Sequence, residues 1–277
     1  MVVFAGQGDA RRSMSLLWRA DRPEQRGRRP GPGPRPGLSV DAIVTAAIAV
    51  ADEDGMAALS MRAVGERLGR TAMALYTYVP SKGELLDLMY DAVHAELTTE
   101  YEGTGNWRAG LTDWARDTLE FHLRHPWVLQ VSQARPVLGP HEYAGLDTLV
   151  RLLTATGLEA HLLRRLVGTL SHFVRGCAGT VAEARQAAAA TGESDEEWWL
   201  ARSALLGEVA PDFADRYPSL MAMETGSAPQ PPASASASAP GEEAVPYLER
   251  EAREMFDVGL GVLLDGIETA IGRTTTP

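Results

Sequence analysis

The spacing of the apolar residues constrains the fold of this chain more than any other feature, because they recur every three or four positions along most of its length. Near the C-terminus one such stripe contains Phe256, Leu260, Leu263, Leu264, Ile267 and Ile271. This spacing places apolar side chains on one face of an α-helix. No alternating strand pattern of useful length accompanies it, so the sequence predicts an all-α protein.

Capping residues and glycines give the bounds of the expected helices. Ser39 and Ser60 are good N-caps, and Gly55 is a plausible C-terminal stop. Ser81 and Ser194 each begin an S-x-x-E capping-box signature. We expect helices at residues 40–54, 61–68, 72–78, 82–100, 107–124, 140–156, 159–190 and 195–208.

The cysteine count and the hydropathy bound the class of protein. The 277 residues include one cysteine, Cys177, so an internal disulfide is excluded and a small buried apolar role is expected for it. No apolar run approaches the roughly 20 residues that a membrane span needs. The first residues lack the order of a secretory signal. A cytoplasmic protein is the expectation.

Charge is distributed unevenly along the chain. Residues 1–37 contain eight arginines and three acidic residues, a net charge of +5. Since the whole chain has a net charge of −11, the remaining residues carry −16. This segment includes RGRRPGPGPRPG, so we expect residues 1–37 to form a disordered basic leader, with Met14 as an alternative start. Residues 225–241, TGSAPQPPASASASAPG, are expected to form a low-complexity surface loop.

Residues 60–84 have the layout of a helix-turn-helix unit, whose second helix can enter the DNA major groove. Two short helices are joined at Gly69, and basic residues outnumber acidic ones over this stretch. Small side chains allow close approach to base edges, and hydroxyl and amino groups can reach phosphates. The alternative is an ordinary solvated turn with Tyr76 buried.

Residues 38–97 resemble the TetR family of bacterial transcriptional regulators. The resemblance is carried by Leu59-Ser60-Met61-Arg62, Val64-x-x-x-Leu68-Gly69, Leu75-Tyr76-x-Tyr78-Val79 and Ser81-Lys82-x-x-Leu85-Leu86. It implies a three-helix DNA-binding head at 38–82 and a ligand-binding, dimerising bundle at 83–277. The DNA-binding residues are then expected to be Arg62, Arg70, Thr71, Ala72, Ala74, Tyr76, Tyr78, Ser81 and Lys82.

The C-terminal region resembles the regulatory domain of the tetracycline repressor. Matching segments are Arg135-Pro136, the run from Gly168 to Cys177, and Phe256-x-x-Gly259-Leu260. The family implies a homodimer on a palindromic DNA operator that a small organic effector releases. Where that repressor has metal-binding and drug-binding histidines, this chain has Val131 and Thr98, so we expect no metal and no cofactor. Candidate effector contacts are Trp114, Phe121, His122, Trp127, Arg135, His172, Phe173 and Arg175.

An enzyme and a protein-binding adaptor are the two alternatives to a repressor. An enzyme could use His122 and His125 as a metal pair, but no third acidic ligand is placed by the sequence, and no phosphate loop or serine elbow is present. A helical adaptor for other proteins would share the apolar C-terminal stripe, yet it would not need Tyr78 and Lys82 at the helix-turn-helix edge. We therefore expect a non-enzymatic regulator.

Overall fold

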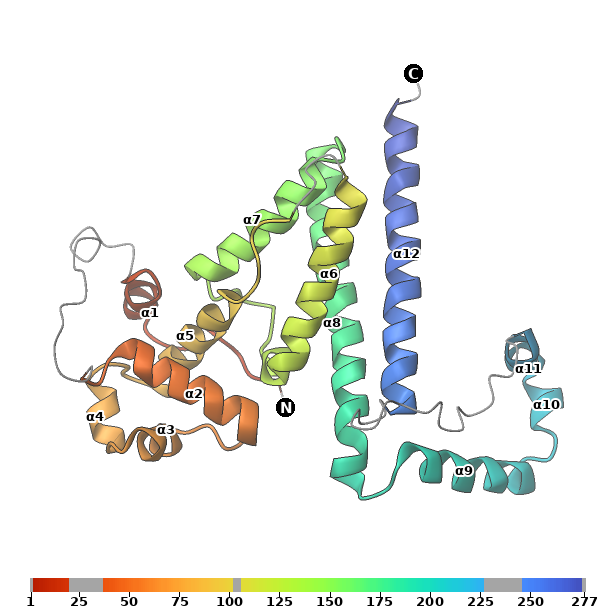
Figure 1. Cartoon of the computed structure of the whole chain (residues 1–277), viewed down its shortest axis with the longest axis horizontal. Coiled ribbons are helices and arrows are strands. Elements are labelled where there is room, and N and C mark those ends of the chain that lie inside the picture. The colour runs from red at the N-terminus through yellow and green to blue at the C-terminus, as the bar shows by residue number, and fades with distance from the viewer. Residues whose placement is uncertain (1, 20–36, 102–105, 227–245, 276–277) are drawn as a thin grey trace, which may run out of the picture. The chain divides into compact units, whose positions relative to one another are not determined.

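The computed structural model describes residues 2–19, 37–101, 106–226 and 246–275, and helices account for most of them (Figure 1). Within these ranges the extended pairing is a single bridge between Val3 and Val131, and the prediction of an all-α protein is confirmed. The elements are α1 (Ala10–Leu17), α2 (Val40–Asp54), α3 (Met61–Leu68), α4 (Ala72–Tyr76), α5 (Lys82–His94), α6 (Trp107–Arg124), the 3₁₀ helix η2 (Pro126–Gln130), α7 (Pro140–Thr154), α8 (Ala160–Thr191), α9 (Asp195–Val209), α10 (Phe213–Arg216), α11 (Pro218–Gly226) and α12 (Tyr247–Thr275).

The predicted capping residues explain where several helices begin and end. The hydroxyls of Ser39 and Ser60 each accept a 3.1 Å hydrogen bond from the amide three residues later. Gly55 ends α2 with a positive φ of 78°. Ser194 and Glu197 form the complete capping box at the start of α9. The sequence therefore predicts the bounds of α2, α3 and α9 to within one residue.

The capping box predicted at Ser81 is incomplete. Ser81 does accept hydrogen bonds from the amides of Gly83 and Glu84. The Glu84 carboxylate, however, contacts the Ser81 hydroxyl and accepts a hydrogen bond from the amide of Asp9, at 3.3 Å. Because Glu84 is buried, its charge holds the N-terminal segment instead of closing the cap.

Three helices are shorter than their predicted ranges. α7 ends at Thr154 and not at residue 156, because the Thr156 amide bonds to the Leu153 carbonyl three residues back. α5 ends at His94 and not near residue 100, because the amides of Ala95, Glu96 and Leu97 bond to carbonyls three residues back, in a tighter turn. α4 ends at Tyr76, after which the amides of Tyr78 and Val79 both bond to the Leu75 carbonyl. The local hydrogen bonding thus ends each helix before its apolar pattern does.

The described residues divide into two compact units, Met1–Gly179 with Val258–Pro277, and Thr180–Asp257. In the first unit, α2 packs on both α5 and α3, and α3 packs in turn on α4 (Figure 1). Their shared core includes the buried residues Ile43, Val64, Leu75, Val79 and Leu85. The same core continues through Trp127 and Val128 of η2, so the helix-turn-helix head packs directly on the element that follows α6.

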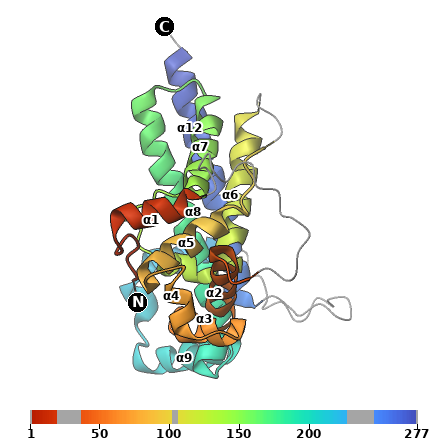
Figure 2. The ribbon, with the colours of Figure 1, turned by 90° about the vertical axis from the view of Figure 1, so that its left-hand side faces the viewer.

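The N-terminal segment contradicts the expectation of a disordered leader. Residues 10–17 form α1, which packs on α5 (Figure 2). Ala5 and Leu17 are buried in the core of the head, and Trp18 Nε1 donates a 3.0 Å hydrogen bond to the Leu138 carbonyl. Composition misled here because the contacts are made by backbone groups and a few apolar side chains. The rest of the leader, residues 20–36, lies outside the described residues.

The second unit contains the end of α8, α9, α10, α11 and the start of α12. The ion pair between Arg185 and Glu249, at 2.8 Å, joins the two long helices inside this unit. α9 has no buried residue, although it carries Trp199, Leu200 and Leu205. The first two residues of the low-complexity loop predicted at 225–241 belong to the end of α11, which reaches Gly226. The rest of that loop lies outside the described residues. Across the described parts of the chain, no helix combines the length and apolarity that crossing a membrane requires.

Candidate nucleic-acid interface and regulatory site

The turn between α3 and α4 is built around two glycines. Gly69 ends α3 in the left-handed conformation, with a φ of 64° that glycine adopts without strain. The amide of Arg70 then bonds to the Gly65 carbonyl at 2.8 Å. A Cβ atom on Gly65 would lie 2.7 Å from the Arg70 carbonyl oxygen. The missing side chain at Gly65 therefore allows the close approach of α4 to α3.

α4 presents a short exposed face on this turn. Thr71 caps the helix by accepting a 3.3 Å hydrogen bond from the Ala74 amide, and the buried Leu75 anchors it in the core. Met73 is 75% exposed, Tyr76 is 42% exposed and Tyr78 is 40% exposed. The alternative of a buried Tyr76 is therefore wrong, because its side chain lies on the exposed face of α4.

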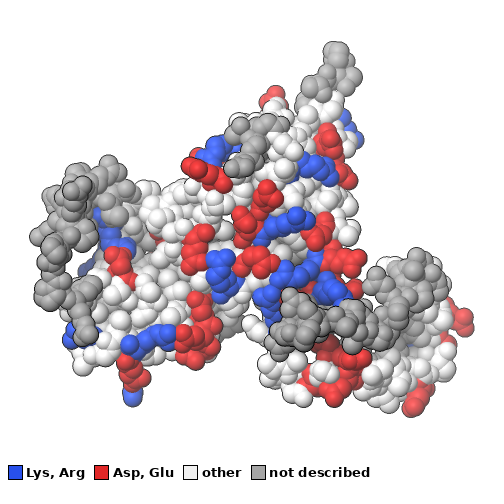
Figure 3. Space-filling view, viewed as in Figure 1, with Lys and Arg blue, Asp and Glu red and all other residues white. Residues whose placement is uncertain are grey.

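The basic residues of the head differ in their availability. Arg62 pairs with Glu66 at 2.8 Å, and Arg67 pairs with Glu53 at 2.6 Å. These pairs raise the pKa of both guanidinium groups. Figure 3 accordingly shows basic and acidic side chains next to one another at the lower left, where α2 and α3 lie. Arg70 is exposed and has no ion pair among the described residues.

Lys82 has a structural contact that its position in the motif did not predict. Its Nζ donates a 2.6 Å hydrogen bond to the Leu59 carbonyl, just before the N-cap of α3. An ammonium group has three donors, so this bond orients Lys82 and leaves donors for a phosphate. The remaining predicted contacts Ala72, Ala74 and Ser81 are partly buried.

Some of the predicted effector contacts lie together inside the first unit. Phe121 and His122 at the end of α6 and Trp127 of η2 are buried, and Phe121 also contacts the rings of His94 and His125. Trp114 is buried two turns earlier on α6. The Nδ1 atom of His122 is buried and has no hydrogen-bond partner among the described residues. Burial, followed by the charge of Arg175, lowers the pKa of His122 to about 3.

The other predicted effector contacts point elsewhere. Arg135 and His172 are exposed, and His172 Nδ1 lies 2.6 Å from the Gly168 carbonyl of its own helix. The Phe173 ring packs on α12, where a Cβ atom on Gly259 would lie 2.8 Å from it. Helical periodicity identified these residues without indicating which neighbouring element each one meets.

Arg175 has a structural role. Its guanidinium group donates to the carbonyls of Val128, Leu129 and Val131, at 3.3, 2.5 and 2.8 Å. These carbonyls belong to η2 and the residue after it, so Arg175 fixes the end of η2 on α8. The guanidinium group is therefore largely used within the protein.

A cavity of about 290 Å³ lies among residues that the sequence did not indicate. It is lined by Thr99, Glu100, Tyr101, Trp107, Arg151, Leu152 and Ala155. Arg151 contacts the Thr99 carbonyl across it. The aromatic residues on either side of Gly103-Thr104-Gly105 were the signal in the sequence, because a break between two helices can leave space beside their ends.

The exposed α4 face on a helix-turn-helix head, followed by a separate helical region, defines a DNA-binding transcriptional regulator. Residues 43–89 match the model for bacterial regulatory proteins of the tetR family. Residues 100–271 match the tetracyclin repressor-like C-terminal domain. The chain therefore belongs to the tetR family of regulators and is not an enzyme.

Two relatives named as transcriptional regulators agree with this assignment. The HTH-type transcriptional repressor DrrR1 of Streptomyces coeruleorubidus is 41% identical over 215 residues, which is 77% of each chain. An HTH-type transcriptional regulator of Saccharopolyspora erythraea is 32% identical over 155 residues, 56% of this chain and 64% of that protein. Both names place the present chain among regulators of transcription.

Solved structures support the fold. Apo ActR of Streptomyces coelicolor superimposes with a TM-score of 0.65 at 23% identity, covering 87% of this chain and all of that one. ActR in complex with actinorhodin gives a TM-score of 0.63 at 24% identity, covering 86% and 100%. At this identity the likeness is one of architecture.

Proposed function

We propose that this regulator is a repressor that binds a palindromic operator as a homodimer and is released by a small organic effector. The observation that carries the proposal is the exposed face of α4. Thr71, Met73 and Tyr76 lie on it, and Tyr78 follows directly. The name of the relative DrrR1 supports repression.

The contacts to DNA would divide into two kinds. Arg70, Thr71, Ala72 and Ala74, at the start of α4, would face the base edges in the major groove. Tyr76, Tyr78, Ser81, Lys82 and Arg62 would contact the phosphates that flank this groove. A five-residue helix offers few base contacts, so two heads reading two half-sites supply the affinity that one lacks.

The surface of α12 supports a homodimer. Phe256, Leu260 and Leu264 are buried against the chain's own helices, whereas Val258 and Val262 are 62% and 66% exposed. Arg108 of α6 holds α12 in place through Asp265 and Glu268. A second apolar stripe on an anchored helix is suited to packing against the same stripe of another copy.

The effector would bind among the buried residues of α6 and η2. Trp114, Phe121 and Trp127 offer apolar and aromatic contacts, and the unpartnered Nδ1 of His122 offers a hydrogen-bonding atom. Because His122 is neutral at pH 7, it suits an uncharged polar group on a mostly apolar molecule. Repression then follows from unequal effector affinity for DNA-competent and DNA-incompetent conformations.

The test is selection of genomic DNA fragments by the purified protein, followed by gel-shift titrations at increasing salt. We expect Tyr78→Phe and Lys82→Ala to weaken binding to the selected fragment, and Lys82→Ala to reduce the slope against log salt by about one unit. Arg164→Ala, at an exposed position on α8, is the matched control and should change neither. Binding that neither substitution in the head affects, or that salt does not weaken, would refute the proposed interface.

A further inference from the structure

The last turn of α2 is strongly acidic, which needs explanation. Asp52, Glu53 and Asp54 lie at the C-terminal end of the helix, where the helix dipole disfavours negative charge. Two of the three carboxylates are bound by side chains of other elements. Glu53 pairs with Arg67 of α3, whereas Asp52 accepts a 2.8 Å hydrogen bond from Trp127 Nε1 in η2. The DNA-binding head is therefore tied to η2 through Asp52.

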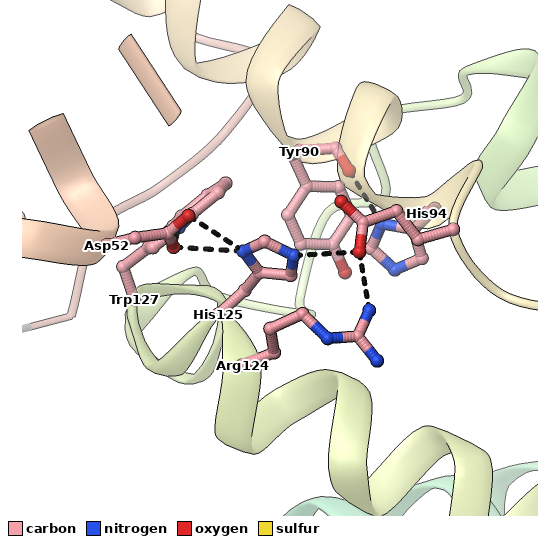
Figure 4. A network of polar contacts seen from close by, with 7 residues as sticks. Asp52, Tyr90, His94, Arg124, His125 and Trp127 are labelled. Carbon is pink, nitrogen blue, oxygen red and sulfur yellow. Dashed lines mark hydrogen bonds and ion pairs between the residues drawn. The ribbon is translucent and has the colours of Figure 1, made fainter. Parts of the chain in front are cut away.

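His125 makes the second link to Asp52 and extends it to a third element. This residue joins α6 to η2, and its side chain is 5% exposed. Its Nδ1 lies 2.9 and 3.1 Å from the two carboxylate oxygens of Asp52, and its Nε2 lies 3.2 Å from Glu96. Figure 4 shows the His125 imidazole facing the Asp52 carboxylate.

This geometry favours the form of His125 that carries a proton on both ring nitrogens. A neutral imidazole has one N–H group, and only the imidazolium can donate from both nitrogens. Because both nitrogens of His125 face carboxylates, the cation satisfies both contacts and the neutral ring satisfies one. Glu96 is further held by Arg124 at 2.5 Å. Burial opposes ionisation of Glu96, but the hydrogen bonds from His125 and Arg124 outweigh it and lower the pKa of that carboxyl.

The neighbouring histidines do not share this charge. Burial lowers the pKa of His94 to about 4 and that of His122 to about 3, so both rings are neutral at pH 7. Neither has a carboxylate partner among the described residues. The titratable and charged groups around His125 are thus Asp52 from α2, Glu96 after α5, Arg124 and His122 from α6, and His94 from α5.

We infer that Asp52, His125 and Glu96 form a protonation-dependent clasp that sets the orientation of the DNA-binding head. The inference rests on the proposed function. The clasp joins the end of α2, the segment after α5 and the end of α6, which are the head, its connecting helix and the regulatory bundle. Loss of the His125 proton removes one of the two bonds and loosens the head, so operator affinity follows the state of the clasp.

The experiment compares wild type with His125→Gln in operator titrations from pH 6 to pH 8.5 at constant ionic strength. His172→Gln is the matched control, since that exposed ring contacts a carbonyl of its own helix. We expect the Kd of wild type and of His172→Gln to rise by about two- to thirtyfold as the pH rises across this range, because the clasp opens. The Kd of His125→Gln should stay nearly constant. Equal pH dependence in all three proteins would overturn the clasp.

Two further measurements keep the test decisive. If His125→Gln unfolds, Asp52→Asn replaces it, because the amide oxygen still accepts from Trp127 while the charge is lost, and we expect the same flattened profile. Independently of DNA, nitrogen NMR of the histidine rings should show both His125 nitrogens protonated at the pH values where the operator is bound most tightly. A His125 ring that stays neutral at those pH values overturns the clasp, whereas failure to recover any genomic fragment with wild type counts only against the proposed function.

Discussion

The backbone amide of Gly6 donates a 2.8 Å hydrogen bond to the carboxylate of Asp87, 81 residues later in α5. One turn earlier on α5, Glu84 accepts from the amide of Asp9, and one turn later Asp91 accepts from the amides of His141 and Glu142. Three buried carboxylates on one helix thus hold the N-terminal segment and the start of α7. α5 joins the head to the bundle, so these bonds fix the helix on which any change of head orientation depends.

Asp87→Asn should stabilise the protein at pH 7. Burial raises the pKa of Asp87, and the hydrogen bond from the Gly6 amide only partly offsets it. A carboxyl with a raised folded-state pKa contributes stability below its ordinary pKa and loses that contribution as the pH rises through the folded value. An asparagine still accepts the Gly6 bond without a charge. We expect a gain in unfolding free energy of about 1 kcal/mol at pH 7, shrinking toward pH 4.

Urea unfolding at several pH values measures this effect. The exposed Asp113→Asn serves as the matched control and should show no such pH-dependent gain. A loss of stability in Asp87→Asn at pH 7 would mean that the ionised carboxylate is better solvated than its burial indicates.

Gly6→Pro should separate the N-terminal segment from α5. Proline lacks the amide that bonds to Asp87, and it cannot adopt the φ of 67° found at Gly6. Leaving Asp87 without this donor should cost about 1–3 kcal/mol of unfolding free energy. Gly6→Ala keeps the amide and bears the strain of the positive φ, so it should lose less. Equal losses for the two variants, measured by thermal unfolding, would show that the hydrogen bond contributes nothing.

The sequence predicted those parts of the fold that depend on local chemistry. The hydroxyls of Ser39 and Ser60 accept hydrogen bonds from amides three residues later, and Gly55 ends α2 by its own backbone conformation. Their positions therefore gave the start of α2, the end of α2 and the start of α3. The N-terminal segment was predicted incorrectly because its bonds reach α5, some 75 or more residues away. Nothing in a stretch rich in arginine, proline and glycine indicates that a buried carboxylate will receive its backbone amides.

The candidate sites show the same division. Spacing within one helix identified the exposed face of α4, so Tyr76 and Tyr78 were placed on the surface that the motif implies. For α8, periodicity could not indicate that Phe173 meets α12 while Arg175 meets η2. The contacts of Asp52 with His125 and Trp127 depend on the packing of three separate elements, and a helix-ending acidic run gave no hint of them.

Gly65→Ala should disrupt the turn of the helix-turn-helix unit. Its Cβ atom would lie 2.7 Å from the Arg70 carbonyl oxygen and 3.3 Å from the Ala72 amide nitrogen, and backbone atoms cannot move aside cheaply. We expect a loss of about 1–3 kcal/mol in unfolding free energy, with weaker operator binding. The matched control is Gly145→Ala in α7, where a Cβ atom meets nothing within 4 Å. That change should add about 0.5–1 kcal/mol, and a comparable loss at both positions would contradict the role assigned to Gly65.

Arg175→Gln should destabilise the protein whether or not an effector binds nearby. The guanidinium group satisfies three carbonyls at the end of η2, and a glutamine amide has too few donors and too short a side chain to replace it. Breaking these charge-assisted bonds should cost about 2–4 kcal/mol of unfolding free energy. Arg165→Gln, at an exposed position on the same helix, should change stability little. If Arg175→Gln keeps wild-type thermal stability and loses only its response to effector, then Arg175 is a binding residue and its contacts with η2 are incidental.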